Sequence, residues 1–314
     1  MEIVFHAASA FDALRTALNS ADGFAYSLSR LTDWRPSGGK SQATFLTTLD
    51  ERYVIKTLPP HSAEKGSLLH FLPAYFDHLK SYASSLLAKI VGFYSILTED
   101  AEEKVLMVME RLAVANEVLR YDLKGIPDRS ATKRHLSRAL SVDAFFKKSP
   151  ASPTNVTRPL DKSEDAGAIT YWDREWLDAG RFGFPDQGLM LFHPDLLPTL
   201  FRVMRADVDL LQRCNMTDYS LLVIIGEEHH QPVCRLAIVD YACPYNLMKM
   251  LEHQGKSQLL QQHHKATVQP PQKYAERFLD GLETSFLSAA CVTRASTKTE
   301  DAVHLEEITR SDAI

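Results

Sequence analysis

The chain has 314 residues, of which 45% are hydrophobic, so it is long enough to bury a sizeable core in one or two lobes. Its 35 basic and 40 acidic residues leave a formal net charge of −5, which argues against broad nucleic-acid binding. Any attraction to a membrane must therefore come from a local basic patch.

The spacing of the cysteines and the length of the apolar runs indicate the cellular compartment of the protein. The four cysteines lie far apart without a Cys-x-x-Cys pair, which favours reduced thiols over a disulfide framework or a zinc site: Cys214, Cys234, Cys243 and Cys291. The N-terminus has no charged-then-apolar signal pattern, and no apolar run approaches the ~20 residues that span a bilayer. We predict a cytoplasmic protein without a transmembrane segment that meets membranes only peripherally.

A glycine-rich turn follows the first predicted elements. Residues 5–34 have helical apolar periodicity, broken at residues 19–23. The turn, Gly-Gly-Lys-Ser at residues 38–41, precedes a strand, and Trp34 stands where a Walker A motif needs glycine, so the turn is not a P-loop. It resembles the glycine-rich hairpin that covers nucleotide phosphates in protein kinases, although a plain turn is the simpler interpretation.

Lys56 interrupts the apolar strand predicted at residues 53–58. Such a lysine either directs its ammonium group to solvent or serves a buried anion. A helix predicted over residues 62–81 supplies the candidate partner, Glu64. The alternative for Glu64 is an acid of the first turn, favoured there by the helix dipole.

Two more apolar runs, residues 86–96 and 105–109, predict strands that complete an antiparallel N-terminal sheet. Residues 110–112 would then link two lobes, and their backbone groups could hydrogen-bond an adenine. A strand at residues 121–125 carries Lys124 at its end. The polar, proline-containing residues 130–167 predict a long loop.

A predicted hairpin carries one carboxylate at each end of its pair of strands. Asp218 enters the first strand and Asp240 leaves the second, so antiparallel pairing would bring both acids to one edge of the sheet. Two carboxylates there suit metal-assisted phosphoryl transfer, one holding Mg²⁺ and the other orienting the attacking hydroxyl. The alternative is that both acids merely cap strand ends. Helices are predicted before and after the hairpin, over residues 194–214 and from residue 271 onward.

Five motifs in a fixed order carry a family resemblance: Gly-Gly-Lys-Ser, Ile-Lys-Thr, Asp-Leu-Lys-Gly, Asp-Tyr-Ser-Leu-Leu-Val and Ile-Val-Asp. They resemble the phosphatidylinositol phosphate kinase family from about residue 5 to about residue 287. Within it, Leu-Ala-Lys-Ile-Val-Gly-Phe-Tyr and Val-Met-Glu-Arg-Leu are most similar to the catalytic domain of the phosphatidylinositol 3-phosphate 5-kinases.

The resemblance implies an α+β fold in two lobes, with antiparallel sheets and flanking helices, similar to SAICAR synthase and distantly to protein kinases. Residues 1–112 would form the N-terminal lobe and residues 113–290 the C-terminal lobe of a single catalytic domain. Residues 291–314 would be a mobile tail.

The resemblance also implies ATP and Mg²⁺ as cofactors and assigns roles to single residues. Asp218, Asp240 and Lys56 would be catalytic, with Asp240 as the Mg²⁺ ligand. The ATP-binding residues would be Gly38, Gly39, Lys40, Ser41, Lys56, Glu64, Glu110, Leu112 and Lys124. Lys249 and Lys256 would face anionic lipid, a solvated surface being the alternative for both.

The implied reaction moves the ATP γ-phosphate to the 5-hydroxyl of phosphatidylinositol 3-phosphate at a membrane surface, with endosomal and vacuolar membranes as candidates. Gln42, Ile126 and Ile224 depart from the family pattern of Gly, Ser and Gly. They motivate an alternative: a kinase fold without turnover that binds phosphoinositide or nucleotide as a regulatory module. The retained lysine and acids count against this alternative.

Overall fold

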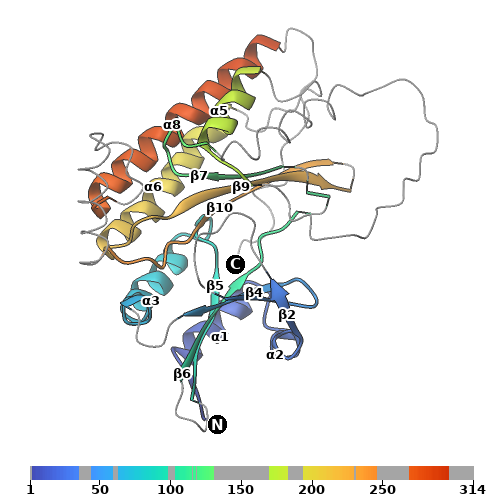
Figure 1. The fold of residues 1–314 in the computed structure, drawn as a ribbon, viewed down its shortest axis with the longest axis vertical. Coiled ribbons are helices and arrows are strands. Elements are labelled where there is room, and N and C mark those ends of the chain that lie inside the picture. Colours follow the sequence, from blue (N-terminus) through green and yellow to red (C-terminus); the bar gives the residue numbers. More distant parts are fainter. Residues whose placement is uncertain are drawn as a thin grey trace, which may run out of the picture.

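The computed structural model describes residues 2–34, 44–58, 63–97, 103–114, 116–117, 119–130, 170–182, 194–229, 231–245 and 269–296. These residues form two lobes, each built on its own sheet (Figure 1). The α+β, two-lobed architecture predicted from the sequence is confirmed.

The N-terminal sheet has six antiparallel strands in the order β1-β5-β6-β4-β3-β2. Their bounds are β1 Glu2–Phe5, β2 Leu31–Trp34, β3 Phe45–Thr48, β4 Tyr53–Leu58, β5 Ile90–Leu97 and β6 Glu103–Glu110. The helices of this lobe are α1 Ala8–Ala17, α2 Phe24–Leu28 and α3 Ala63–Ser81. The expectation of a helical segment over residues 5–34 was only partly right, because the strands β1 and β2 flank the two helices. Both are four-residue edge strands, too short to show the alternation by which strands are recognised.

The C-terminal sheet has four strands in the order β10-β9-β7-β8, antiparallel except where β8 pairs with β7. Their bounds are β7 Leu119–Leu123, β8 Thr170–Tyr171, β9 Ser220–Glu228 and β10 Gln231–Val239. Three helices lie along one side of this sheet in Figure 1: α5 Asp173–Phe182, α6 Leu197–Arg213 and α8 Pro271–Ser296, and a single 3₁₀ turn, η1 Pro194–Leu196, leads into α6. The helices predicted over residues 194–214 and from residue 271 are confirmed, as is the one over residues 62–81.

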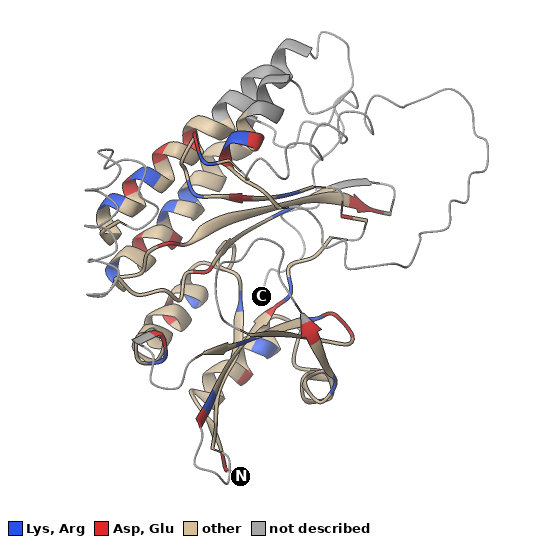
Figure 2. Ribbon diagram, in the orientation of Figure 1, with Lys and Arg blue, Asp and Glu red and all other residues tan. Residues whose placement is uncertain are grey.

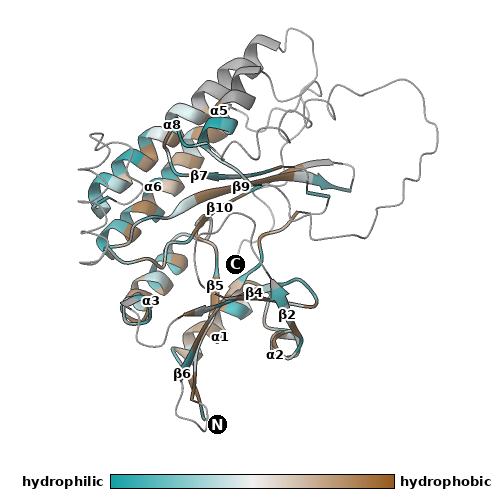
Figure 3. Cartoon of the chain, viewed as in Figure 1, coloured by the Kyte–Doolittle hydropathy of each residue, from teal (hydrophilic) through white to brown (hydrophobic). Residues whose placement is uncertain are grey.

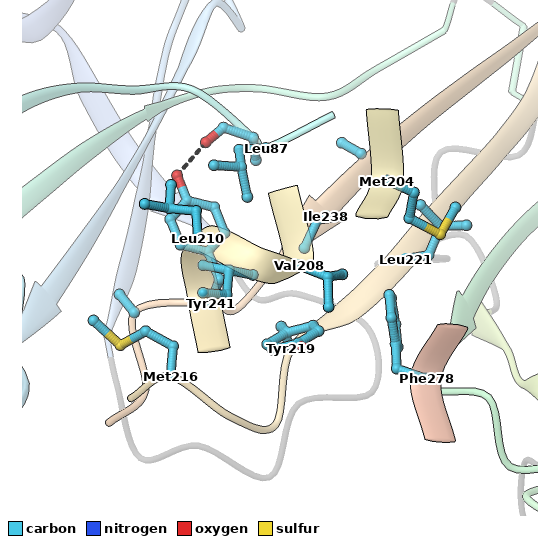
Figure 4. Packing of buried hydrophobic residues seen from close by; sticks show 14 of the residues in the cluster. Leu87, Met204, Val208, Leu210, Met216, Tyr219, Leu221, Ile238, Tyr241 and Phe278 are labelled. Carbon is cyan, nitrogen blue, oxygen red and sulfur yellow. Dashed lines mark hydrogen bonds between the residues drawn. The ribbon is translucent and has the colours of Figure 1, made fainter. Parts of the chain in front are cut away.

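One apolar core joins the two lobes. It contains side chains of α3 in the N-terminal lobe and of α6, α8, β9 and β10 in the C-terminal lobe. Figure 3 shows the hydrophobic stretches of β9 and β10, and Figure 4 shows Leu87 of the N-terminal lobe among side chains of α6 and β10. The lobes are therefore packed against each other and not only linked by the chain.

Several segments for which we made predictions lie outside the described residues: the glycine-rich turn, most of residues 130–167 and most of the loop that carries Lys249 and Lys256. Helix α8 continues to Ser296, beyond residue 291 where we expected the tail to begin. Among the residues that the structure describes, no helix is both long and apolar enough to cross a bilayer.

Candidate functional site

Asp218 and Asp240 lie at the same end of the β9–β10 hairpin. Ser220 pairs with Val239 at that end, so the two acids stand just outside the last rung of the ladder. Both have left-handed backbones, with φ of +65° at Asp218 and +58° at Asp240. Such a conformation is uncommon for residues other than glycine and is tolerated best by Asn and Asp.

A tyrosine follows each acid and is buried. Tyr219 is 0% exposed and Tyr241 is 3% exposed, and both belong to the shared core. The left-handed acid and the buried tyrosine therefore form the same short unit twice. In each unit the tyrosine anchors the chain directly beside the carboxylate.

Lys124 holds Asp218 from the neighbouring strand. Its ammonium nitrogen lies 2.6 Å from Asp218 Oδ1 and 2.6 Å from the Asp218 carbonyl oxygen. Antiparallel pairing of β7 with β9 brings these residues together although they are far apart in the sequence. The lysine fixes both the side chain and the backbone of the acid.

A buried network behind Lys124 was not anticipated from the sequence. Asp173, at the first turn of α5, accepts the amide protons of Lys124 at 2.9 Å and Ile126 at 3.1 Å. The Arg129 guanidinium bridges Asp173 at 3.1 Å and Asp122 at 2.9 Å. Burial raises the pKa of Asp173, and Arg129 pulls that pKa back down. These residues shape the turn that directs Lys124 toward Asp218.

Lys56 and Glu64 form the corresponding pair in the N-terminal lobe. Lys56 lies in β4 and Glu64 in the first turn of α3, with Nζ and Oε2 separated by 4.0 Å. The predicted partners are thus adjacent, at a separation that a bound anion could tighten or replace.

Charged residues of both lobes influence the pKa of Asp240. Burial raises its pKa above the ordinary value; Lys56 and then Lys124 pull the pKa down, and Asp122 and Asp218 push it up. The residue as a whole is exposed to solvent. Lys56 and Asp122 lie in the N-terminal and C-terminal sheets, respectively, and Lys124, Asp218 and Asp240 lie just outside strands of the C-terminal sheet. The structure therefore places Lys124, Asp218 and Asp240 at one end of the hairpin, and the pKa of Asp240 responds to the charge of Lys56.

Asp218 and Asp240 are the carboxylates of the site that could bind a metal ion. In the described part of the chain, no group of three or more His, Cys, Asp or Glu side chains could hold a metal ion. Mg²⁺ is usually bound by one or two carboxylates together with substrate phosphates and water, which is what Asp240 and Asp218 could offer.

The residues predicted as an adenine hinge are Glu110, the last residue of β6, and the two that follow it, Arg111 and Leu112. The Glu110 amide donates to Lys89 O at 2.9 Å and the Arg111 amide to Arg52 O at 2.8 Å. These two amides are therefore committed to the fold. Burial raises the pKa of the Glu110 carboxyl, and Lys89 and Arg52 partly offset this.

The remaining predicted site residues are not placed. Gly38, Gly39, Lys40 and Ser41 lie outside the described residues, as do Lys249 and Lys256. The two strands that flank the glycine-rich turn, β2 and β3, pair in antiparallel register.

Residues 26–232 and 225–285 match the family model described as Phosphatidylinositol-4-phosphate 5-Kinase. The chain belongs to this family. The resemblance drawn from the five motifs is thereby confirmed.

Relatives in three kingdoms align with most of the chain. It is 30% identical to 1-phosphatidylinositol-3-phosphate 5-kinase FAB1B of Arabidopsis thaliana over 300 residues, which cover 89% of this chain and 14% of the relative. The identity is 27% to 1-phosphatidylinositol 3-phosphate 5-kinase FAB1 of Saccharomyces cerevisiae, over 88% of this chain and 11% of the relative. It is 28% to the human 1-phosphatidylinositol 3-phosphate 5-kinase, over 86% of this chain and 12% of the relative. The chain thus spans less than a sixth of the length of these relatives.

The two departures from the family pattern that the structure describes are accommodated by burial. Ile126 is 7% exposed and follows the turn that Asp173 holds, and Ile224 is 1% exposed within β9. Neither residue separates Lys124 from Asp218.

Proposed function

We propose that the chain is an ATP-dependent phosphatidylinositol phosphate kinase that phosphorylates the 5-hydroxyl of phosphatidylinositol 3-phosphate. The observation that carries this proposal is the shared electrostatic environment of Asp240, which Lys56 influences from the N-terminal lobe and Lys124 from the C-terminal lobe. A site that moves a charged phosphoryl group needs cations and a metal-binding carboxylate at one place. The lipid and the position of the hydroxyl are those in the names of the relatives.

The reaction joins the inositol 5-oxygen to the γ-phosphorus and breaks the bond between that phosphorus and the oxygen that bridges to the β-phosphate. ADP leaves, and the hydroxyl proton passes to the Asp218 carboxylate. Lys56, oriented by Glu64, neutralises phosphate charge, and Lys124 holds Asp218 in place. Catalysis in this class is mostly positioning and charge neutralisation, which is the work these four side chains can do.

Mg²⁺, held by Asp240 and the nucleotide phosphates, would neutralise the charge that develops on the leaving ADP. The fit rests on Asp240, an exposed residue whose pKa is lowered by the charges of Lys56 and Lys124.

Other parts of the site are assigned by the same proposal. Gly38, Gly39, Lys40 and Ser41 cover the phosphates, and the backbone near Leu112 receives the adenine. Lys249 and Lys256 face an anionic membrane surface, each adding roughly 1 kcal/mol of attraction. Figure 2 shows mixed charges along α6 and α8, and Arg205 of α6 pairs with Glu283 of α8, so these helices do not form a surface of one sign. The protein would work in the cytoplasm, peripherally on endosomal or vacuolar membranes.

The test uses radiolabelled ATP, Mg²⁺ and vesicles that contain one of the three monophosphorylated phosphatidylinositols. We expect label only with phosphatidylinositol 3-phosphate, and chromatography of the deacylated product should place the new phosphate on the 5-position. Label on another lipid or another hydroxyl would refute the assigned specificity. Vesicle binding without any labelled product would instead favour the alternative of a regulatory module without turnover.

A further inference from the structure

Residues 85–90 form a strap between the lobes. This segment joins the end of α3 to the start of β5 and also pairs with β10. The Ala88 amide donates to Ile238 O at 2.9 Å, the Ile238 amide donates to Leu86 O at 2.7 Å, and Leu87 forms a parallel bridge with Ile238. Because Ile238 lies two residues before Asp240, these hydrogen bonds fix the end of β10 that directly precedes this acid.

The strap is fixed at its other backbone groups too. Asp207 of α6 is 0% exposed and accepts the Leu86 amide at 2.6 Å, while its other oxygen lies 2.6 Å from His78 Nε2 of α3. The Lys89 ammonium donates to Ser85 O at 2.7 Å and Leu87 O at 2.9 Å. Buried backbone groups that all have partners resist displacement, since each lost bond leaves an unsatisfied polar group.

Tyr241 binds the strap from the other side of Asp240. Its hydroxyl donates to the Ala88 carbonyl, the hydrogen bond drawn dashed at Tyr241 in Figure 4. The Tyr75 hydroxyl also binds the strap, because it donates to Ile90 O at 3.2 Å. The Ile90 amide donates to the Tyr75 hydroxyl at 2.8 Å.

Hydrogen bonds to the strap therefore lie on both sides of Asp240 in the sequence. Ile238, two residues before it, accepts from the Ala88 amide, and Tyr241, the next residue, donates to the Ala88 carbonyl. The backbone of Asp240 itself is left-handed. From the strap the connection continues through β5 and β6 to β4, where Lys56 pairs with Met107 of β6. A continuous set of hydrogen bonds thus ties the carboxylate of one lobe to the sheet that carries the lysine of the other.

We propose that Tyr241 is a positioning residue: its hydroxyl bond to the Ala88 carbonyl sets the place of Asp240 relative to the N-terminal lobe. The inference rests on the proposed function, because it assumes that Asp240 binds the metal of the nucleotide. Tyr241 itself touches neither nucleotide nor lipid in this assignment.

The test is Tyr241→Phe, with Tyr75→Phe as the matched control. Both substitutions remove one hydroxyl from a buried tyrosine, but Tyr241→Phe breaks the bond to Ala88 beside β10, whereas Tyr75→Phe breaks only bonds to Ile90 at the start of β5. For Tyr241→Phe we expect roughly tenfold lower kcat and a severalfold higher Mg²⁺ concentration at half-maximal rate, as the loss of one buried hydrogen bond would give. For Tyr75→Phe we expect a lower Tm without a change in the Mg²⁺ requirement.

A double-substitution cycle gives a readout apart from turnover. Calorimetry measures the Kd of MgATP for the wild type, Tyr241→Phe, Asp240→Asn and the double variant. If the hydroxyl acts through Asp240, Tyr241→Phe weakens binding in the wild type and has no further effect beside Asp240→Asn, whereas a purely structural role gives additive effects. Additive effects, or a wild-type Mg²⁺ requirement in Tyr241→Phe, would overturn the inference.

The same cycle separates this inference from the proposed function. If the wild type labels no lipid, the proposed function fails, and if Asp240→Asn changes neither MgATP binding nor lipid phosphorylation, the metal-binding role of Asp240 fails. If Asp240→Asn abolishes both and Tyr241→Phe changes neither, only the positioning role fails. Should Tyr241→Phe fold poorly, Asp207→Ala removes the acceptor of the Leu86 amide with Tyr241 intact and must raise the Mg²⁺ requirement in the same direction. An unchanged requirement in a folded Asp207→Ala counts against the strap.

Discussion

Gly125 and Gly281 meet backbone to backbone where α8 packs against the residues that follow β7. A Cβ atom on Gly281 would collide with the carbonyl oxygen of Gly125, and a Cβ atom on Gly125 would lie 2.8 Å from the carbonyl oxygen of Arg277. Gly125 also has φ of +67°, which favours glycine. Because Gly125 directly follows Lys124, this contact sets how far α8 stands from the lysine that holds Asp218.

The close approach predicts opposite outcomes for one substitution at two helical glycines. Gly281→Ala should lower the free energy of unfolding by about 1–3 kcal/mol, as overpacking does. Gly66→Ala in α3, where nothing lies within 4 Å of the added methyl group, should raise it by about 0.5–1 kcal/mol. Chemical denaturation measures both, and a stabilised Gly281→Ala would show that α8 does not press on Gly125.

Asp173 should be essential for the turn that carries Lys124. Asp173→Asn leaves Arg129 facing an amide in a buried site, and breaking a buried ion pair costs about 3–5 kcal/mol. The variant should also lose phosphoryl transfer, because the amides of Lys124 and Ile126 lose a charged acceptor. Asp77→Asn breaks the exposed pair with Lys80 and should change neither stability nor rate measurably. Equal effects of the two substitutions would contradict this account.

Glu64 should matter for catalysis more than for stability. Glu64→Gln removes the charge that faces Lys56 and should lower kcat/KM roughly tenfold, or about 1.4 kcal/mol of transition-state stabilisation. Glu103→Gln is the matched control, because it breaks the ion pair with Lys65, the next residue of α3. It should lower Tm while kcat/KM stays at the wild-type value. A normal rate for Glu64→Gln would remove Glu64 from the site.

The Glu110 side chain should be dispensable for ATP binding, since the predicted hinge uses backbone groups. Glu110→Gln is expected to leave the KM for ATP unchanged. Its stability relative to the wild type should depend on pH. Burial makes the folded state hold the Glu110 proton more tightly than the unfolded chain, whose carboxyl titrates near 4.5.

The sign of that pH dependence follows from the raised pKa. As pH rises from about 4.5 through the folded-state pKa, the wild type loses the stability that this group contributes at low pH, whereas glutamine does not titrate. The difference in unfolding free energy between Glu110→Gln and the wild type should grow over that window and then level off, at about 1 kcal/mol or less in a partly solvated position. A difference that shrinks with rising pH would mean that Lys89 and Arg52 outweigh burial.

The hairpin with its two acids was predictable because all the needed information lies within a short segment. Two β-branched runs around a polar turn define the strands, and the antiparallel register then brings Asp218 and Asp240 to one edge without further assumptions. Lys56 and Glu64 were predictable in the same way, from a strand and the helix that follows it.

The supporting network was not predictable because its members come from distant segments. Asp173 reaches the turn after β7 only because β8 pairs in parallel with β7 across a long intervening stretch. The burial of Asp207 could have been predicted from the sequence, because it lies on the apolar face of α6, three residues after Met204 and four before Leu211. A carboxylate on such a face needs a buried partner, here His78 and the Leu86 amide.

The most direct measurement of the central claim is the rate of phosphoryl transfer to phosphatidylinositol 3-phosphate by Asp240→Asn, with Tm as the measure of folding. If Lys56, Lys124, Asp218 and Asp240 act on one magnesium nucleotide, the rate should fall about a thousandfold or more while Tm stays within a few degrees of the wild type. A folded Asp240→Asn that phosphorylates the lipid at the wild-type rate would contradict the account.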